Sequence, residues 1–400
     1  MKYWMALICC IAICMSGALA ADQTEFVSQE GVLWFTDGKN LGLKSVQGDV
    51  ILSPVFTEVS AFYNNLAIVS IDDQKGVIDI CGEYILPCTY QDIEMYDGAF
   101  IVVDRNGYKL IDMHGNNLSG SFAGIYENNG LFVISNGNAF GILDYSGHTI
   151  CEPIFSDIGE FTEGWVRVTY NEKYCNYINL DGEYLLSEWC DFGTRFSGGW
   201  AAILQDDSYY FINAKGDIFE SGYTYVDWYP SDGYFIACKG EKWCIFQPSV
   251  NCEQIINADM VLSLSNGLSP IYVSGLWGYC NAKGDIVVAP QYEYVSSFSE
   301  GRAYVKYNEC YYYIDTEGNV ISHGKITFAN PFREGLAACV DAETGKMGFI
   351  DTNGRWTIAP EYDALGSFWF SNGTCTIYEI DGYVTIINRN GAIICEYLIQ

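Results

Sequence analysis

The side chains of this sequence that could do chemistry lie mostly at turns. The histidines are His114, His148 and His323; the first two stand next to glycines, and the third follows Gly318 in a loop. Histidines at turns are solvated, which favours a structural position over a metal or acid–base site. The sequence has no G-x-S-x-G motif to present a nucleophilic serine, no P-loop and no dinucleotide-binding glycine motif. We therefore predict no catalytic residue.

The 50 Asp and Glu residues are too many for any one pair to be informative. A glycosidase needs two carboxylates at a set separation. Five of the aspartates recur at one position of a repeated turn, which favours a structural role; they are Asp79, Asp112, Asp144, Asp315 and Asp351. Residues 351–357 also loosely resemble the Asp-box of sialidase-like propellers, which is itself a turn motif.

Calcium is the one cofactor that the sequence leaves open. Adjacent acids at Asp72 and Asp73, and at Asp206 and Asp207, could attract the ion, although no D-x-D-x-D-G loop is present. We expect no other metal or cofactor.

Thirteen cysteines follow residue 20, at positions 81, 88, 151, 175, 190, 238, 244, 252, 280, 310, 339, 375 and 395. Their number is odd, they are spread along the chain, and no C-x-x-C pair suggests a zinc site. We interpret most of them as small buried side chains in strands. Some pairs could still form disulfides in an oxidising compartment.

The N-terminus has the pattern of a secretory signal. Lys2 precedes an almost entirely apolar stretch from Trp4 to Ala20, and Ala18 and Ala20 fit the small-residue cleavage rule. We predict a signal peptide over residues 1–20 and a secreted or cell-envelope protein, with no stable membrane span after cleavage. The alternative is an uncleaved anchor, since 17 apolar residues approach the length of a span.

The composition describes a chain that can bury a large core. Half of the 400 residues are hydrophobic, 16% are aromatic and the formal charge is −30. Such a chain is not disordered as a whole, and its acidic surface argues against binding nucleic acid.

One cycle of about 34 residues repeats along the chain. Its anchor is a residue that closes a turn, and eleven copies occur, at Gly48, Gly82, Gly115, Gly147, Gly182, Gly216, Asn251, Gly284, Gly318, Gly354 and Gly391. Asp or Asn stands three residues before most anchors, as at Asp79, Asp144, Asn281, Asp315 and Asp351. Asp or Asn can bond its own backbone two residues on, and Gly accepts a left-handed conformation, so the pair predicts a tight hairpin turn.

Other positions keep phase with the anchor. Pro290 and Tyr292 follow Gly284 by six and eight residues, Phe298 follows it by fourteen, and a Glu-Gly pair comes next at Glu300. Flanking residues alternate as strands do, and we expect Pro290 to end the second strand because it has no N–H for the ladder. Residues 21–400 thus predict an all-β array of tandem β-meander repeats. The array could close into one or more propeller-like rings or form an open curved solenoid.

The unit at residues 276–292, followed by 298–303, resembles a WG repeat, a bacterial β-repeat with a Trp-Gly signature. Residues 346–362 and 140–155 are further copies. The signature Trp is kept only at Trp277, and Pro248 replaces the turn Asp before Asn251. The resemblance implies a β-repeat scaffold, often in exported or surface proteins, and it implies no reaction.

Dense aromatic runs are the best functional hint, at residues 209–211, 223–229 and 311–313. Rings beside carboxylates suit sugar stacking or protein contacts, although cross-strand core pairs would explain them too. The leading hypothesis is an exported, non-enzymatic scaffold that binds a protein or glycan through an extended surface. The alternatives are a secreted glycosidase-like hydrolase, with carboxylates gathered in one deep pocket, and a self-associating structural component of the envelope.

Overall fold

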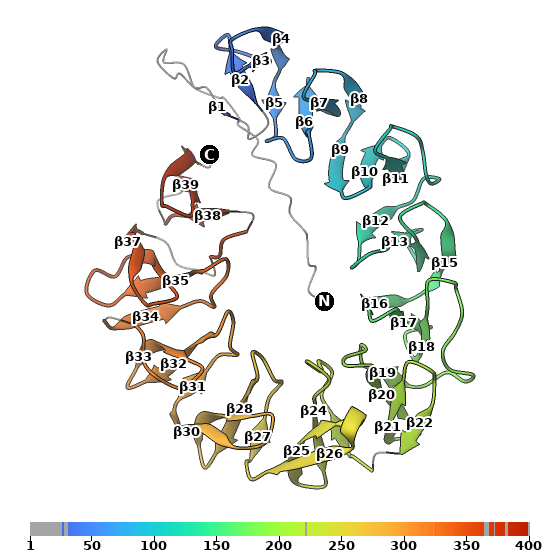
Figure 1. Ribbon diagram of the computed structural model, residues 1–400, viewed down its shortest axis with the longest axis vertical. Helices are drawn as coiled ribbons and strands as arrows, with labels where there is room; N and C mark the ends of the chain where they lie inside the picture. The colour runs from blue at the N-terminus through green and yellow to red at the C-terminus, as the bar shows by residue number, and fades with distance from the viewer. Residues whose placement is uncertain are drawn as a thin grey trace. The chain divides into compact units, whose positions relative to one another are not determined.

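The structure is a computed structural model of the chain. It describes residues 26–27, 31–220, 222–322, 324–363, 368–371, 373–380 and 383–398 (Figure 1). The predicted signal peptide and His323 lie outside these residues. Two compact units are present. The first extends to Phe161 and includes Val168–Glu172 and Ile178–Glu183; the second contains Thr162–Arg167, Lys173–Tyr177 and the chain from Tyr184 onward.

The first unit contains antiparallel sheets whose strands follow sequence order. Their strands are β1 (Phe26–Val27), β2 (Val32–Thr36), β3 (Leu41–Ser45), β4 (Val50–Phe56); β5 (Glu58–Val59), β6 (Leu66–Ile71), β7 (Gln74–Asp79), β8 (Tyr84–Tyr90); β9 (Asp92–Tyr96), β10 (Ala99–Asp104), β11 (Gly107–Asp112); and β12 (Gly124–Glu127), β13 (Phe132–Ser135), β14 (Phe140–Leu143), β15 (Thr149–Phe155). At the boundary of the units lie β16 (Asp157–Thr162), β17 (Trp165–Tyr170) and β18 (Tyr174–Ile178).

The second unit continues the same pattern. Its strands are β19 (Phe192–Gly193), β20 (Trp200–Gln205), β21 (Ser208–Asn213), β22 (Ile218–Glu220); β23 (Tyr225–Val226), β24 (Phe235–Lys239), β25 (Lys242–Gln247), β26 (Cys252–Ile256); β27 (Met260–Val261), β28 (Leu268–Val273), β29 (Leu276–Asn281), β30 (Ile286–Tyr292); β31 (Tyr294–Val295), β32 (Arg302–Tyr307), β33 (Cys310–Asp315), β34 (Ile326–Ala329), β35 (Leu336–Asp341), β36 (Met347–Asp351), β37 (Trp356–Tyr362); and β38 (Thr374–Tyr378), β39 (Tyr383–Asn388), β40 (Ile393–Leu398).

These sheets confirm the predicted all-β fold of tandem meander repeats. Each repeat contributes three or four antiparallel strands, and the seven strands β31–β37 join two repeats through the pair Tyr311 and Ile326. Within the described residues the one helical segment is a 3-10 turn, η1 (Pro248–Val250). No described helix has the length and apolarity that crossing a bilayer requires.

A carboxylate or amide organises the turn at nine of the eleven anchors, and at Gly48 the Ser45 hydroxyl accepts the N–H of Asp49 instead. The Asp79 side chain accepts hydrogen bonds from the backbone N–H groups of Cys81 and Glu83, both at 2.9 Å. Gly82 donates its N–H to the Asp79 carbonyl at 3.0 Å and has a φ of 82°, a conformation that costs glycine little. The same bonds form in the turns of Gly115, Gly147, Gly182, Gly216, Gly284, Gly318, Gly354 and Gly391.

The repeat anchored at Asn251 forms its turn without an Asp or Asn three residues earlier. Pro248 begins the 3-10 turn η1, and Asn251 takes the left-handed conformation with φ of 48° while its N–H bonds the Pro248 carbonyl at 3.0 Å. Asparagine is among the few residues other than glycine that visit this conformation readily. The anchor position therefore requires a left-handed backbone conformation, which either Gly or Asn can adopt.

The prediction that Pro290 ends its strand is wrong. Strand β30 runs through Pro290 to Tyr292, and its register against β29 shifts between the pairs Tyr279 with Val288 and Trp277 with Tyr292. Pro290 lies in this bulge on an edge strand, where the sheet needs no N–H from it. Opposite the bulge is Gly278, where a Cβ would lie 2.4 Å from the Val288 carbonyl oxygen and 2.7 Å from the Pro290 nitrogen.

The same close approach recurs in other repeats, at Gly42 with Pro54, Gly141 with Pro153, and Gly348 with Pro360. Glycine six residues before the anchor and proline six residues after it are therefore two sides of one contact. The glycine is needed because the bulged backbone passes directly over it.

Buried tyrosine hydroxyls bond the backbone just after the first strand of the following repeat. Tyr279 has no exposed surface, and its hydroxyl donates to the Ser296 carbonyl at 2.6 Å. That carbonyl accepts no ladder bond from Tyr304, whose N–H goes to the Ser296 hydroxyl at 3.0 Å. Tyr177 and Tyr313 make the equivalent bonds to Thr194 and Asn330.

Consecutive repeats are also joined by side chains reaching backbone N–H groups. Glu163, the first residue of a Glu-Gly pair, accepts from the N–H groups of Gly198 and Gly199, both at 2.7 Å. Glu300 accepts from Gly335 at 2.8 Å and Glu334 from Gly373 at 2.9 Å. Each carboxylate therefore clips its own repeat to the next one, about one period along the chain. This clip explains why the Glu-Gly pair keeps phase with the anchor.

Candidate functional site

The described histidines lie at turns. The backbone N–H of His114 donates to Asp112 and that of His148 to Asp144, both at 2.9 Å. The His148 ring is exposed, with Nδ1 4.0 Å from an Asp144 oxygen. The turn aspartates use their oxygens on backbone N–H groups, so these carboxylates have a structural role.

The acidic pairs that could hold calcium are turn residues as well. Asp72 and Asp73 have φ values of 47° and 62°, and Asp206 and Asp207 have 49° and 60°. These left-handed conformations close the hairpins between β6 and β7 and between β20 and β21. Across the described part of the chain, no three His, Cys, Asp or Glu side chains are grouped so that they could hold a metal ion.

Most described cysteines are small core side chains, as the sequence predicts. Seven of the twelve are buried, and Cys280 and Cys339 have no exposed surface. Burial raises the pKa of the Cys280 thiol to about 11, so it stays protonated at neutral pH. One pair stands apart from this pattern: the sulfurs of Cys175 and Cys190 lie 3.0 Å apart.

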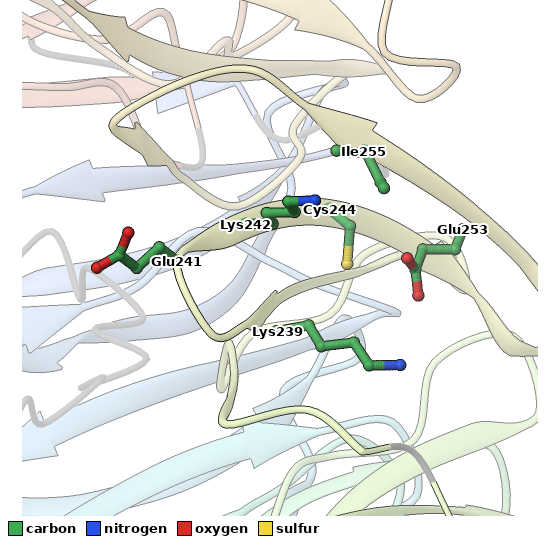
Figure 2. A pocket seen from close by; sticks show the side chains of 6 residues that line it. All are labelled: Lys239, Glu241, Lys242, Cys244, Glu253 and Ile255. Carbon is green, nitrogen blue, oxygen red and sulfur yellow. The ribbon is translucent and has the colours of Figure 1, made fainter.

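A hollow of about 500 Å³ lies on the sheet β23–β26 of the second unit, lined by Lys239, Glu241, Lys242, Cys244, Glu253 and Ile255 (Figure 2). Glu253 accepts a hydrogen bond of 2.5 Å from the Tyr223 hydroxyl, and the Lys239 ammonium lies 5.9 Å from the Tyr223 ring centroid. The hollow therefore carries both signs of charge.

This hollow is not arranged for hydrolysis. Figure 2 shows the carboxylates of Glu241 and Glu253 at opposite sides of it, whereas glycoside hydrolysis needs two carboxylates facing one bond. Burial raises the pKa of Cys244 to about 12, which keeps that thiol protonated and a poor nucleophile. Its mixed charge suits weak polar binding.

The predicted aromatic runs divide between the core and the surface. Phe211, Tyr223 and Tyr313 are buried, as the core interpretation of these runs expects. In contrast, Tyr225, Trp228 and Tyr229 are exposed by 37%, 51% and 69%. Contiguous exposed apolar side chains mark contact sites, whereas singly scattered ones are normal, so the arrangement of these rings matters.

The exposed rings belong to a row at equivalent positions. Each repeat begins with a short strand containing a buried residue such as Val226 or Val295, and the preceding side chain points outward. In four consecutive repeats of the second unit this side chain is large, apolar and at least partly exposed: Phe192, Tyr225, Met260 and Tyr294. In the next repeat Phe328 packs against the core instead. In the first unit the same position holds Glu58, Asp92, Gly124 and Asp157.

A one-residue insertion enlarges this row. Three residues, Asp227 to Tyr229, separate the buried Val226 from the bend that begins at Pro230, where neighbouring repeats have two. Pro230 replaces the core phenylalanine found at Phe196 and Phe298. Trp228 turns outward and packs on Phe192, with ring centroids 3.9 Å apart, and the Arg167 guanidinium lies 5.3 Å from the Phe192 ring. The rings of adjacent repeats thus touch.

We call Phe192, Tyr225, Trp228, Tyr229, Met260 and Tyr294 the aromatic face. A side-chain contact also joins two of its repeats: the Trp243 indole N–H donates to the Asp259 carbonyl, next to Met260, at 3.1 Å. The sequence runs indicated Tyr225, Trp228 and Tyr229 but missed Phe192, Met260 and Tyr294. These three stand nine or ten residues after their anchors, a position that the aromatic runs alone do not reveal.

Comparison with known proteins identifies the repeat. A family model described as WG containing repeat matches residues 42–74, 140–174, 277–311, 313–339 and 347–383. The matched segments include the three copies on which the sequence resemblance rests. No curated protein matches the chain in sequence.

Similar solved structures have low sequence identity. BamB from Moraxella catarrhalis is 12% identical, with a TM-score of 0.34, over 63% of this chain and 91% of that chain. A eukaryotic initiation factor is also 12% identical, with a TM-score of 0.47, over 84% of this chain and 96% of that chain. With TM-scores below 0.5, these likenesses carry no inference about this chain.

Proposed function

The chain is a WG-repeat protein, and from this premise we propose that it is an exported, non-enzymatic scaffold that binds a protein or glycan partner through the aromatic face. The observation that carries the proposal is the row of large apolar side chains at equivalent positions of four consecutive repeats. Repeat proteins form extended binding surfaces in this way, because one outward position recurs once in each unit.

The insertion at Asp227 to Tyr229 supports the same proposal. The repeats of Phe196, Leu264 and Phe298 keep this bend short and bury an apolar side chain in the core at its end. Exposing Trp228 and Tyr229 gives up burial that their neighbours achieve. A departure from the repeat pattern that exposes two rings is what a binding site requires and what folding alone does not.

Arrays of polysaccharides and of proteins, probed with residues 21–400, test the proposal. We expect a ligand whose affinity falls about tenfold or more when Trp228 and Tyr229 are both changed to Ala, since exposed aromatic anchors carry much of the binding energy of an interface. Phe219→Ala is the matched control. Its ring is exposed by 47% on β22, the opposite edge of the sheet that begins with β19, and its loss should leave binding unchanged.

Two results would contradict the proposal. Turnover on a panel of hydrolase substrates, without any array ligand, would support the glycosidase-like alternative. Self-association abolished by the same double substitution, again without a ligand, would support a structural component of the envelope.

A further inference from the structure

The segment after β18 is attached to its sheet at a few points. The Leu185 N–H donates to the Tyr177 carbonyl at 2.9 Å, and the Asn176 side chain bonds both backbone groups of Leu186, at 2.9 and 3.0 Å. In the sheet β12–β15 a fourth strand follows the anchor turn, but residues 184–190 form no strand beside β18. Instead, Cys175 and Cys190 exchange two backbone hydrogen bonds, of 2.8 Å and 3.0 Å, in an isolated antiparallel bridge. This bridge fixes the end of the segment.

The two side chains of this bridge are placed for a covalent bond. Reciprocal hydrogen bonds define a pair whose Cα atoms lie about 5.5 Å apart, within the range of about 4.4–6.8 Å that a disulfide accepts. The sulfur atoms already lie 3.0 Å apart, and both residues are buried, with 2% and 1% of their surface exposed. A small side-chain rotation would bring the sulfurs to bonding distance without moving the backbone.

We propose that Cys175 and Cys190 are a modification site at which a disulfide forms, pinning residues 184–190 against β18. The oxidant is a disulfide-exchange donor, such as oxidised glutathione or the disulfide of an oxidoreductase. The inference stands independently of the binding function, because it rests on the bridge alone.

The reaction balances as two thiol–disulfide exchanges. In one order, the Cys190 thiolate attacks one sulfur of the donor, and the donor's other sulfur leaves with the electron pair. Cys175 then loses its proton and attacks the Cys190 sulfur, which releases the second donor sulfur. Two electrons and two protons pass from the cysteines to the donor, whose disulfide becomes two thiols.

The docked segment distinguishes the two thiols. A hydrogen bond from Cys175 lowers the pKa of the Cys190 thiol, and the same contact raises the pKa of Cys175. Both sulfurs are buried there, so a donor reaches them before residues 184–190 dock during folding, when the two thiols are equivalent and either can attack first.

Peptide mapping tests the proposal directly. The protein is refolded in a glutathione redox mixture, denatured in iodoacetamide without reductant, and digested with trypsin. Lys173 and Arg195 bracket a peptide that contains Cys175 and Cys190 and no other cysteine. We expect this peptide without alkyl groups and lighter by two hydrogen atoms than its reduced form. The peptide with Cys339, an equally buried thiol, should be alkylated.

Thermal unfolding tests the pinning. Dithiothreitol should lower the unfolding midpoint of the oxidised wild type by several degrees, and it should leave a variant with Cys175→Ser and Cys190→Ser unchanged. Cys339→Ala should keep the wild-type response to the reductant. Two alkyl groups on the 174–195 peptide, or a link from it to another cysteine, would overturn the site. Equal midpoints with and without reductant would overturn the pinning.

Discussion

At the scale of single residues, Asn and Asp side chains play the same structural role in the anchor turns. Asn281 and Asp315 occupy the same place in neighbouring repeats, and each accepts backbone N–H bonds from residues two and four positions on. The shape of the turn needs only the acceptor oxygen. The aspartate adds a negative charge, and that charge makes its turn sensitive to pH.

Hydrogen bonding lowers the pKa of several turn aspartates. At Asp112 the side-chain amide of Asn116 is the main cause, followed by the backbone N–H of Asn116. At Asp315 burial acts in the opposite direction, but the side chain and backbone of Asn319 outweigh it and the pKa is again lowered. In both cases the folded pKa lies below the ordinary value of 3.8.

This direction predicts acid sensitivity. Stability from these groups is present above pH 3.8 and is lost as the pH falls through the lower folded pKa, because the unfolded chain binds protons first. A variant with Asp112→Asn and Asp315→Asn should be less stable than the wild type near pH 7, because it lacks the charge that these hydrogen bonds stabilise, and it should lose less stability between about pH 5 and 3. Urea unfolding midpoints across about that range provide the measurement, and parallel curves for the two proteins would contradict the prediction.

At the scale of elements, the sequence revealed which positions recur but not how they meet. Gly278 and Pro290 both recur at fixed distances from the anchor, and the sequence alone predicts that the proline ends a strand. The error came from considering one strand alone: a proline that cannot pair is tolerated where a bulge on an edge strand asks for no N–H. The contact across the bulge became visible only when two strands were placed side by side.

This contact predicts a large effect of one methyl group. Gly278→Ala should destabilise the protein by about 1–3 kcal/mol, because its Cβ would overlap the Val288 carbonyl oxygen and the neighbouring backbone must move. Gly124→Ala is the matched control in a strand, where the nearest atom to an added Cβ is 3.8 Å away. Chemical denaturation measures both variants, and equal stabilities would refute the explanation.

Counting residues from the anchor also assigns one core aromatic position to the wrong residue. The sequence period points to Phe368 as the counterpart of Phe298, yet Phe370 takes that place, packing on Phe349 at 5.1 Å as Phe298 packs on Tyr279 at 4.9 Å. Small insertions shift the count of residues without shifting the fold.

At the scale of the whole molecule, the sequence predicts the class of fold well and the binding surface only in part. The repeat period and the turn residues are local features that recur many times, so one atypical repeat does not obscure the pattern in the others. A surface is made by the few positions where repeats differ, such as Trp228, and those differences become meaningful only after the repeats are superimposed in space.

Export is the prediction that belongs to the full chain. Expressed in a bacterial host with residues 1–20 in place, the protein should leave the cytoplasm and begin at Ala21. Leucine at both Ala18 and Ala20 should block cleavage, because the peptidase needs small side chains there. Ala6→Leu is the control within the apolar stretch and should be processed normally. N-terminal sequencing decides, and a wild-type protein retained with Met1 would contradict the prediction.

The carboxylate clips have a consequence for how such an array can diversify. Glu300 grips a backbone N–H, and a backbone N–H is present whichever side chain its residue bears, provided that the local shape persists. The repeat that donates this N–H can therefore change nearly all of its exposed side chains and still be bonded to the repeat before it. Repeats with an acidic residue at the outward position, such as Glu58, and repeats with an aromatic residue there, such as Tyr294, can then occur in one chain. The exposed residues can diverge while the contacts between repeats are kept.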